Sequence, residues 1–212
     1  MSESQILGGM DPFRIAVAQA PDTAAALLPP DAADRLTDRI YRLRGSAPTV
    51  EVVPVPDVAL EHLDPAALIA SGAHAVILSV VSEIDSPATE FAAAADRIIT
   101  AIRNEDGPHL AWFTASTVEP EGSDAYRTRP ERFALRALRL DAELVRLSRT
   151  RGVALIDADR IVAELGGADH VVAPLHYSPA ASEALAEETV RVLDDIGFFE
   201  PRPLVEQIGA GS

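Results

Sequence analysis

Short apolar runs alternate with amphipathic segments along most of the chain. The run at 75–81, Ala-Val-Ile-Leu-Ser-Val-Val, is almost entirely apolar, as expected for a central parallel strand that is buried on both faces. The amphipathic segments carry apolar residues at helical spacing, which is typical of helices that cover such a sheet. The predicted strands span 13–20, 49–55, 75–81, 109–114 and 152–157, and the predicted helices span about 32–43, 58–71, 87–105, 130–149, 159–165 and 179–195.

Five strands that alternate with helices predict βαβ units, and hence an α/β fold with a parallel sheet covered on both faces. Ser86 and Ser178 each precede a proline at a predicted helix start, so both suit the N-cap position. Residues 1–12 are expected to form a flexible lead-in, residues 13–196 a single domain, and residues 197–212 a tail. No internal repeat or linker divides the predicted domain.

The composition narrows the possible functions. The chain has 212 residues, enough for one domain with a full hydrophobic core. Its 18 basic residues are all arginine and it has no cysteine, which excludes lysine Schiff bases, thiolate nucleophiles and disulfides. The formal net charge of −15 opposes binding to nucleic acids and anionic membrane surfaces. Because neither a signal-peptide pattern nor an apolar run of about 18 residues is found, a cytoplasmic protein is expected.

Ligands of open parallel sheets bind outside the carboxyl ends of the strands. Here the loops at 20–24, 55–58, 81–86 and 114–130 follow predicted strands, and the loop at 167–177 precedes the last helix. Carboxylates and a histidine at such a place suit acid–base chemistry or a divalent cation. Because 33 acidic residues place several near any cleft and His is sparse, we predict neither a metal site nor a cofactor. The acidic candidates are Asp22, Asp57, Glu83 and Asp85.

His176 lies in the stretch Ala-Pro-Leu-His-Tyr-Ser-Pro, directly before the last predicted helix. Its imidazole suits a base near neutral pH, and its place near the strand ends favours a functional role. The alternative is a structural role, in which it only covers the helix end that Ser178 caps. His170, with Asp169 beside it, is a second candidate in the same loop.

The C-terminal part of the chain, GVALIDADRIV…LHYSPAASEALAEETVRVL, resembles the end of SGNH (GDSL-type) hydrolases. The order of elements over most of residues 13–196 is similar to that family as well. The resemblance implies a flavodoxin-like three-layer α/β/α sandwich with a five-stranded parallel sheet, and a small acyl or ester substrate. It also implies a serine nucleophile, Gly and Asn oxyanion donors, and an Asp-x-x-His pair whose histidine His176 matches.

The other family positions are substituted. Ala173 stands where the Asp of Asp-x-x-His is expected, and Glu83 lies about where the Asn would be, although an ionised carboxylate cannot donate to an oxyanion. The segment VVPVPDV in the second block has no glycine. The string nearest to Gly-Asp-Ser is Pro21-Asp22-Thr23, in which Thr23 either replaces the serine hydroxyl or, like Asp22, caps a helix.

Arginines are concentrated between 127 and 151. Those on the predicted helix at 130–151 form either a solvated face or a docking site for an acidic partner such as a carrier protein. The expected ligand contacts near the cleft are Arg127, Arg129, Ser82 and Asp57.

Two interpretations remain open. The first is an SGNH-like protein with a degenerate triad, which acts on or binds a small acyl- or ester-type ligand. Its expected catalytic residues are His176, Thr23, Asp22 and Glu83, in a hydrolase, an acyltransferase-like enzyme or a repurposed acid–base enzyme. The second is a non-catalytic relative that uses its Arg-rich helix as an interface.

Overall fold

The computed structural model describes residues 12–46, 48–56, 58–103, 107–118, 133–173 and 176–200. Five strands form one sheet in the order β2-β1-β3-β4-β5, and each neighbouring pair is parallel. This arrangement confirms the predicted flavodoxin-like fold class with a five-stranded parallel sheet. The strands are β1 (Phe13–Ala18), β2 (Val50–Val55), β3 (Ala75–Ser79), β4 (His109–Phe113) and β5 (Ala154–Ile156).

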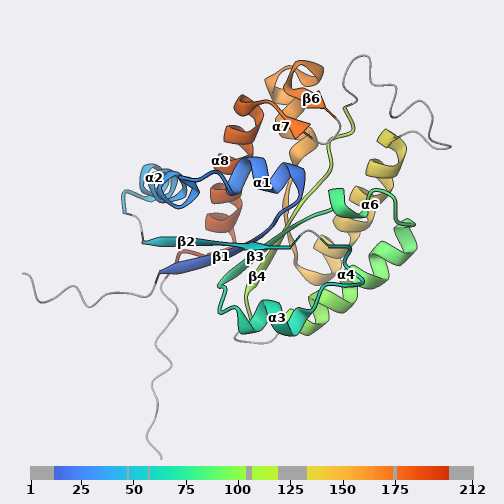
Figure 1. The fold of residues 1–212 in the computed structure, drawn as a ribbon, viewed down its shortest axis with the longest axis horizontal. Helices are drawn as coiled ribbons and strands as arrows, with labels where there is room; N and C mark the ends of the chain where they lie inside the picture. The colour runs from blue at the N-terminus through green and yellow to red at the C-terminus, as the bar shows by residue number, and fades with distance from the viewer. Residues whose placement is uncertain are drawn as a thin grey trace, which may run out of the picture.

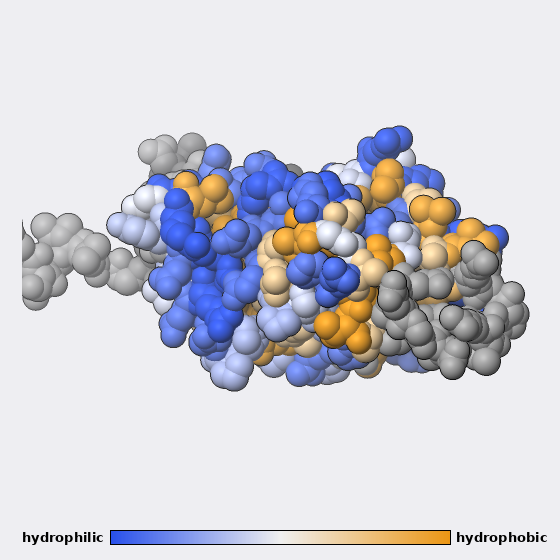
Figure 2. Space-filling view, turned by 90° about the horizontal axis from the view of Figure 1, so that it is seen from above, coloured by the Kyte–Doolittle hydropathy of each residue, from blue (hydrophilic) through white to orange (hydrophobic). Residues whose placement is uncertain are grey.

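Helices cover both faces of the sheet, which gives three layers (Figure 1). Alternation along the strands explains this: in β1, Ile15 and Val17 belong to one core, whereas Ala16 and Ala18 belong to the other. Figure 2 looks onto the upper helical layer of Figure 1, whose surface is mostly hydrophilic toward the end where α2 lies. The helices are α1 (Pro21–Leu27), α2 (Ala32–Arg44), α7 (Ala158–Leu165) and α8 (Pro179–Asp195) on one face, and α3 (Pro65–Ala70), α4 (Ala88–Ile102) and α6 (Phe133–Arg151) on the other.

Short elements complete the connections at the strand ends. A 3-10 turn, η2 (Val81–Glu83), follows β3, which ends two residues earlier than the sequence predicted. A second turn, η3 (Gly167–His170), leads into an antiparallel hairpin of β6 (Val171–Ala173) and β7 (His176–Tyr177). The sequence analysis did not predict α1 or this hairpin, since both are only a few residues long.

The predicted helix caps have different outcomes. Ser178 caps α8 as predicted, because its hydroxyl oxygen accepts the amide hydrogen of Ala181 at 3.2 Å. The cap predicted at Ser86 is wrong: α4 begins after Pro87 with no side-chain cap. The Ser86 hydroxyl instead donates to Glu83 at 2.9 Å, a buried acceptor that competes with the helix end.

Two phenylalanines in the segment 197–200, which the sequence analysis assigned to a tail, pack against the sheet. Phe198 and Phe199 are buried, and their ring centroids lie 5.3 Å and 6.0 Å from that of Phe13 in β1. Such tilted and edge-to-face pairs are favourable arrangements of aromatic rings. The hydrophobic core of the described chain therefore continues past the end of α8.

Candidate functional site

Six polar side chains lie near the carboxyl ends of β1, β3, β4 and β5. Hydrogen bonds join Asp22 to Ser79, and Ser116 to Tyr177 and Asp159. Asp141 binds the backbone of Ala115, the residue before Ser116. We call this group the strand-end cluster: Asp22 (α1), Ser79 (β3), Ser116 (after β4), Asp141 (α6), Asp159 (α7) and Tyr177 (β7).

Asp22 connects the start of α1 to the end of β3. Its side chain is completely buried, and one carboxylate oxygen accepts the Ser79 hydroxyl hydrogen at 2.7 Å. The other oxygen accepts the amide hydrogen of Thr23 at 2.7 Å. Pro21 occupies the first turn of α1, where its missing amide hydrogen costs nothing. The structure therefore places Asp22 at the strand ends, as the sequence predicted, and gives its carboxylate two donors.

Thr23 is fully buried, and its hydroxyl faces the backbone. That hydroxyl donates to the carbonyl oxygen of Ala18 at 2.5 Å, with the carbonyl of Ala20 at 3.2 Å as a second acceptor. A threonine hydroxyl has one proton to donate. Because this proton is directed at a backbone carbonyl, the arrangement differs from a nucleophile that hydrogen-bonds to a general base.

Tyr177, rather than His176, extends from the hairpin into the cluster. The two residues are neighbours in β7, so their side chains point to opposite sides; Tyr177 is buried and His176 is exposed. The Tyr177 hydroxyl oxygen accepts the amide hydrogen of Ser116 at 3.3 Å. Burial, and then the charge of Asp22, raises the pKa of Tyr177 above its usual range. The hydroxyl therefore stays neutral at physiological pH.

Asp159 secures the loop that follows β4. Its carboxylate accepts the Ser116 hydroxyl hydrogen at 3.2 Å and the Thr117 amide hydrogen at 2.7 Å. The Thr117 hydroxyl donates to the same carboxylate at 2.9 Å. These bonds hold the Ser116 amide where it meets Tyr177 and join α7 to the end of β4.

Asp141 is an acid in the cluster whose pKa is strongly raised. It is half-buried on α6, where one oxygen accepts the Ala115 amide hydrogen at 3.0 Å. Burial raises the pKa of Asp141 to about 7, the Ala115 amide opposes this, and the negative charges of Asp159 and Asp157 add to it. A carboxyl group of this kind changes its charge near neutral pH, as a general acid or base must.

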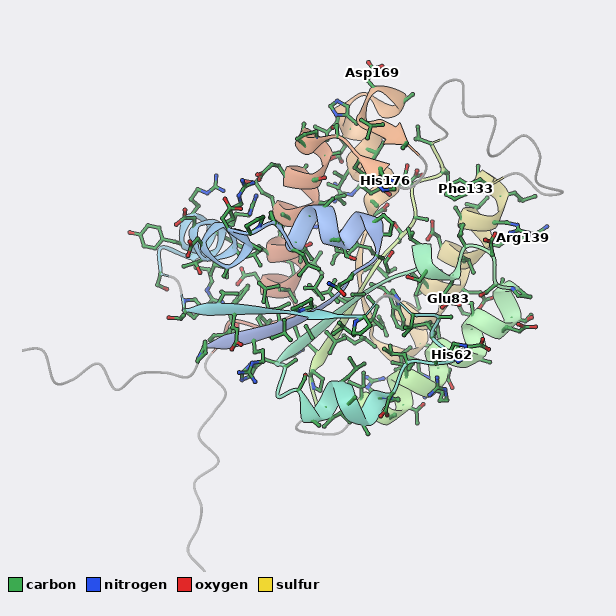
Figure 3. The ribbon with its side chains drawn as sticks, viewed as in Figure 1. His62, Glu83, Phe133, Arg139, Asp169 and His176 are labelled. Atoms are coloured by element: carbon green, nitrogen blue, oxygen red, sulfur yellow. The ribbon has the colours of Figure 1, made fainter. Side chains whose placement is uncertain are left out.

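The other residues proposed from the sequence lie in different environments. Glu83 is buried and accepts the Leu60 amide hydrogen at 2.6 Å and the Ser86 hydroxyl hydrogen at 2.9 Å, so it joins two loops. Figure 3 shows Glu83 toward α4 and His176 apart from it, and β7 packs against α1. Ser82 is half-buried beside Glu83. The predicted contacts Asp57, Arg127 and Arg129 lie outside the described residues.

The second histidine candidate supports the start of α8. Nδ1 of His170 lies 2.8 Å from the hydroxyl oxygen of Ser178, and the backbone oxygen of His170 accepts the Ser178 amide hydrogen at 2.9 Å. His170 therefore makes a contact with the helix cap of the kind that the sequence analysis considered for His176. Asp169 lies beside it on the outside of the molecule (Figure 3).

Sequence reasoning missed five of the six cluster members, although two of them carried a signal. Asp141 lies among the apolar positions Ala137, Leu140 and Leu144 of its helix, where an acid is unexpected. Ser79 ends the most apolar strand. Ser116, Asp159 and Tyr177 gave no comparable signal, because only the fold brings them together.

Two further findings concern the described residues as a group. None of their His, Asp and Glu side chains forms a group of three or more that is arranged to hold a metal ion. Among the described helices, none combines the length and the hydrophobicity that crossing a bilayer requires.

No family model matches the sequence, and no curated protein sequence is significantly similar to it. Solved structures do share the fold. The aryl esterase of M. smegmatis has a TM-score of 0.62 at 12% identity, over 86% of this chain and 98% of that one. A lipase/acylhydrolase from Enterococcus faecalis has a TM-score of 0.60 at 18% identity, over 87% of this chain and 97% of that one. Est24, a carbohydrate acetylesterase from Sinorhizobium meliloti, has a TM-score of 0.60 at 10% identity, over 86% of this chain and 99% of that one.

These structural neighbours include esterases, lipolytic proteins and SGNH hydrolases. Their low sequence identities show a common fold and leave the activity of this chain to be argued from its own site. The chain has an SGNH-hydrolase-like fold, which confirms the resemblance in its C-terminal sequence.

Proposed function

We propose that the protein binds a small acyl- or ester-type ligand at the carboxyl ends of its strands and does not form an acyl-enzyme on Thr23. The Tyr177 hydroxyl serves as a neutral donor to the ligand, and His176 lies at the rim on the other side of β7. The observation that carries this proposal is the position of that hydroxyl, which is held by the Ser116 amide and kept protonated by burial. A tyrosine oxygen that accepts one hydrogen bond keeps its own proton for a second partner, such as a ligand carbonyl.

The direction of the Thr23 hydroxyl supports binding without covalent chemistry. An acyl-enzyme requires a hydroxyl that transfers its proton to a base during attack. Thr23 donates to the Ala18 carbonyl instead, and its buried position leaves no space for an attacking geometry. Glu83, near the family's oxyanion position, is an acceptor of two hydrogen bonds and cannot stabilise a developing negative charge.

A pocket beside Tyr177 suits a small acyl group. It lies between α1 and α8 and has a volume of about 300 Å³. Alanine and proline side chains form its apolar part, and Ser182 and the ion pair of Arg35 with Glu183 supply polar groups. Small-molecule sites combine an apolar lining with a few polar groups in this way. The structural neighbours described as esterases and acylhydrolases make an acyl or ester group the first ligand class to test.

The proposal is tested by binding of methyl butyrate to the full chain, measured by saturation-transfer NMR. We expect Tyr177→Phe to weaken binding about tenfold, since it removes one hydrogen bond from a buried site. The matched control is Tyr41→Phe, because Tyr41 is an exposed tyrosine on α2, and it should bind like the wild type. Equal binding by wild type and Tyr177→Phe would overturn the role of the Tyr177 hydroxyl.

Turnover of p-nitrophenyl butyrate separates binding from hydrolysis. We expect no burst of p-nitrophenol, and a rate that His176→Ala changes no more than His62→Ala. Both histidines are exposed and are labelled in Figure 3, so the second variant controls for loss of a surface imidazole. Hydrolysis that disappears in His176→Ala but not in His62→Ala would assign a catalytic role to His176 and overturn the non-covalent part of the proposal.

A further inference from the structure

The outer face of α6 exposes apolar side chains in a regular row. The inner face of this helix buries Ala137, Leu140, Leu144 and Leu147 in the core shared with α4. On the opposite side, Leu135, Leu138 and Val145 are 42%, 57% and 38% exposed. With exposed Ala142 they follow i, i+3, i+7 and i+10 spacing, so they lie on one face of the helix. We call the row Leu135, Leu138, Ala142 and Val145 the α6 surface.

Arginines border the α6 surface. Arg139, Arg146 and Arg149 are exposed and alternate with the apolar residues along the helix, and Arg139 points outward in Figure 3. The sequence of α6 contains five arginines and two acids; Asp141 is half-buried, and Glu143 pairs with Arg146 at 2.7 Å. This helix is therefore a basic surface on a protein whose formal net charge is −15.

A recess adjoins the first turns of the α6 surface. It has a volume of about 350 Å³ and lies between the start of α4 and α6, where Arg136 and Arg139 line one side and Ser86 and Thr89 the other. Arg136 also binds Asp85 at 2.6 Å, which fixes this edge of the recess.

We propose that the α6 surface docks an acidic amphipathic helix of a partner protein. A row of apolar residues at this spacing matches the anchors of a second helix packed against it. The arginines at its border select a partner with Asp and Glu beside its own apolar row. The proposal goes beyond the function proposed above and does not depend on it.

The observations disfavour two other occupants. In a two-fold symmetric dimer through α6, the same patch faces itself, so Arg139, Arg146 and Arg149 of the two copies meet. An anionic membrane attracts the arginines of α6, but it repels the rest of an acidic protein. Both occupants are included as outcomes in the experiment.

The probe is a synthetic peptide helix of about 20 residues with leucines at i, i+3, i+7 and i+10, flanked by glutamates. Its binding to the full chain is followed by fluorescence anisotropy, and the same peptide with lysines at the flanks is the charge control. We expect the acidic peptide to bind at least about tenfold more tightly than the lysine peptide, with weaker binding as salt rises. Leu138→Ala, and separately Arg146→Glu with Arg149→Glu, should each weaken binding about tenfold.

The matched control is the double variant Arg42→Glu, Leu43→Ala on α2. It removes an exposed arginine and an adjacent exposed leucine far from α6 in the sequence, and it should bind like the wild type. Equal binding of the two peptides, or an equal loss in the α2 variant, overturns the proposal. So does self-association in sedimentation equilibrium that Leu138→Ala removes, or binding to phosphatidylglycerol vesicles that the α6 arginine variant removes.

Discussion

Replacing Asp141 by Asn tests whether the carboxyl group of Asp141 in the strand-end cluster lowers the unfolding free energy of the protein. The Asp141 carboxyl is largely buried, accepts one amide hydrogen from Ala115, and has a pKa raised from 3.8 to about 7. Asn has nearly the same shape and keeps an oxygen that accepts the Ala115 hydrogen, but it carries no charge. The substitution therefore removes the ionisation and little else.

The sign of the pH effect follows from the direction of the pKa shift. An acid whose pKa is raised on folding favours the folded state most below about pH 4, where both states are protonated. This stability is lost as the pH rises toward 7, since the unfolded chain ionises at lower pH. With about 1.4 kcal/mol for each pH unit, ionisation of folded Asp141 costs about 4 kcal/mol above pH 7. Between about pH 5 and pH 8 the cost rises by about 2 to 3 kcal/mol.

The measurement is urea unfolding of the wild type and Asp141→Asn at about pH 5 and pH 8. Trp112 is the only tryptophan and is completely buried, so its fluorescence reports unfolding of the core. We expect the stability gain of the variant to be about 2 to 3 kcal/mol larger at pH 8. The control Asp38→Asn, at an exposed site on α2, should show the same difference from the wild type at both pH values. An equal gain at both pH values for Asp141→Asn would refute the reasoning.

Two further substitutions test the packing of residues that the sequence analysis assigned differently. Phe198→Ala should lower the unfolding free energy by about 3 kcal/mol or more, because it opens a cavity in the core. The control is Ile196→Ala, at a half-exposed position, which should lower the unfolding free energy much less. Equal losses for the two variants in urea unfolding would place the end of the packed domain before residue 197. Glu83→Ala should cost about 2 kcal/mol or more, since it leaves the buried Leu60 amide and Ser86 hydroxyl without their acceptor. The NMR assay should then show unchanged methyl butyrate binding, whereas a loss of binding in a folded variant would make Glu83 part of the site.

The layered fold was predictable because its signals are local. The run at 75–81 contains almost only apolar residues, and the structure makes its first five residues the central strand β3. The predicted last helix matches α8, because Ser178, the following proline and the apolar spacing all agree. The Ser86 cap failed because Glu83, which lies in the same turn, accepts the hydroxyl hydrogen in place of the helix end.

The candidate site was less predictable, because its members meet only through tertiary packing. Asp22 was identified from its place after the first strand, but its partner Ser79 lies 57 residues away. His176 drew attention through its chemistry, whereas Tyr177 enters the cluster because β7 pairs with β6 in a register that turns it inward. A two-residue strand carries no periodicity from which that orientation can be predicted.

The cost of Asp141 bears on whether the cluster is functional. A side chain that serves only packing gains nothing from a charge that destabilises the folded state by about 4 kcal/mol at neutral pH, and Asn fills the same space. Functional sites retain such groups because ligand binding or catalysis depends on them. If Asp141→Asn is more stable and binds methyl butyrate more weakly, the destabilising carboxyl group serves the ligand. If it is more stable and binds equally well, the cluster acts through Tyr177 and the Ser116 amide alone.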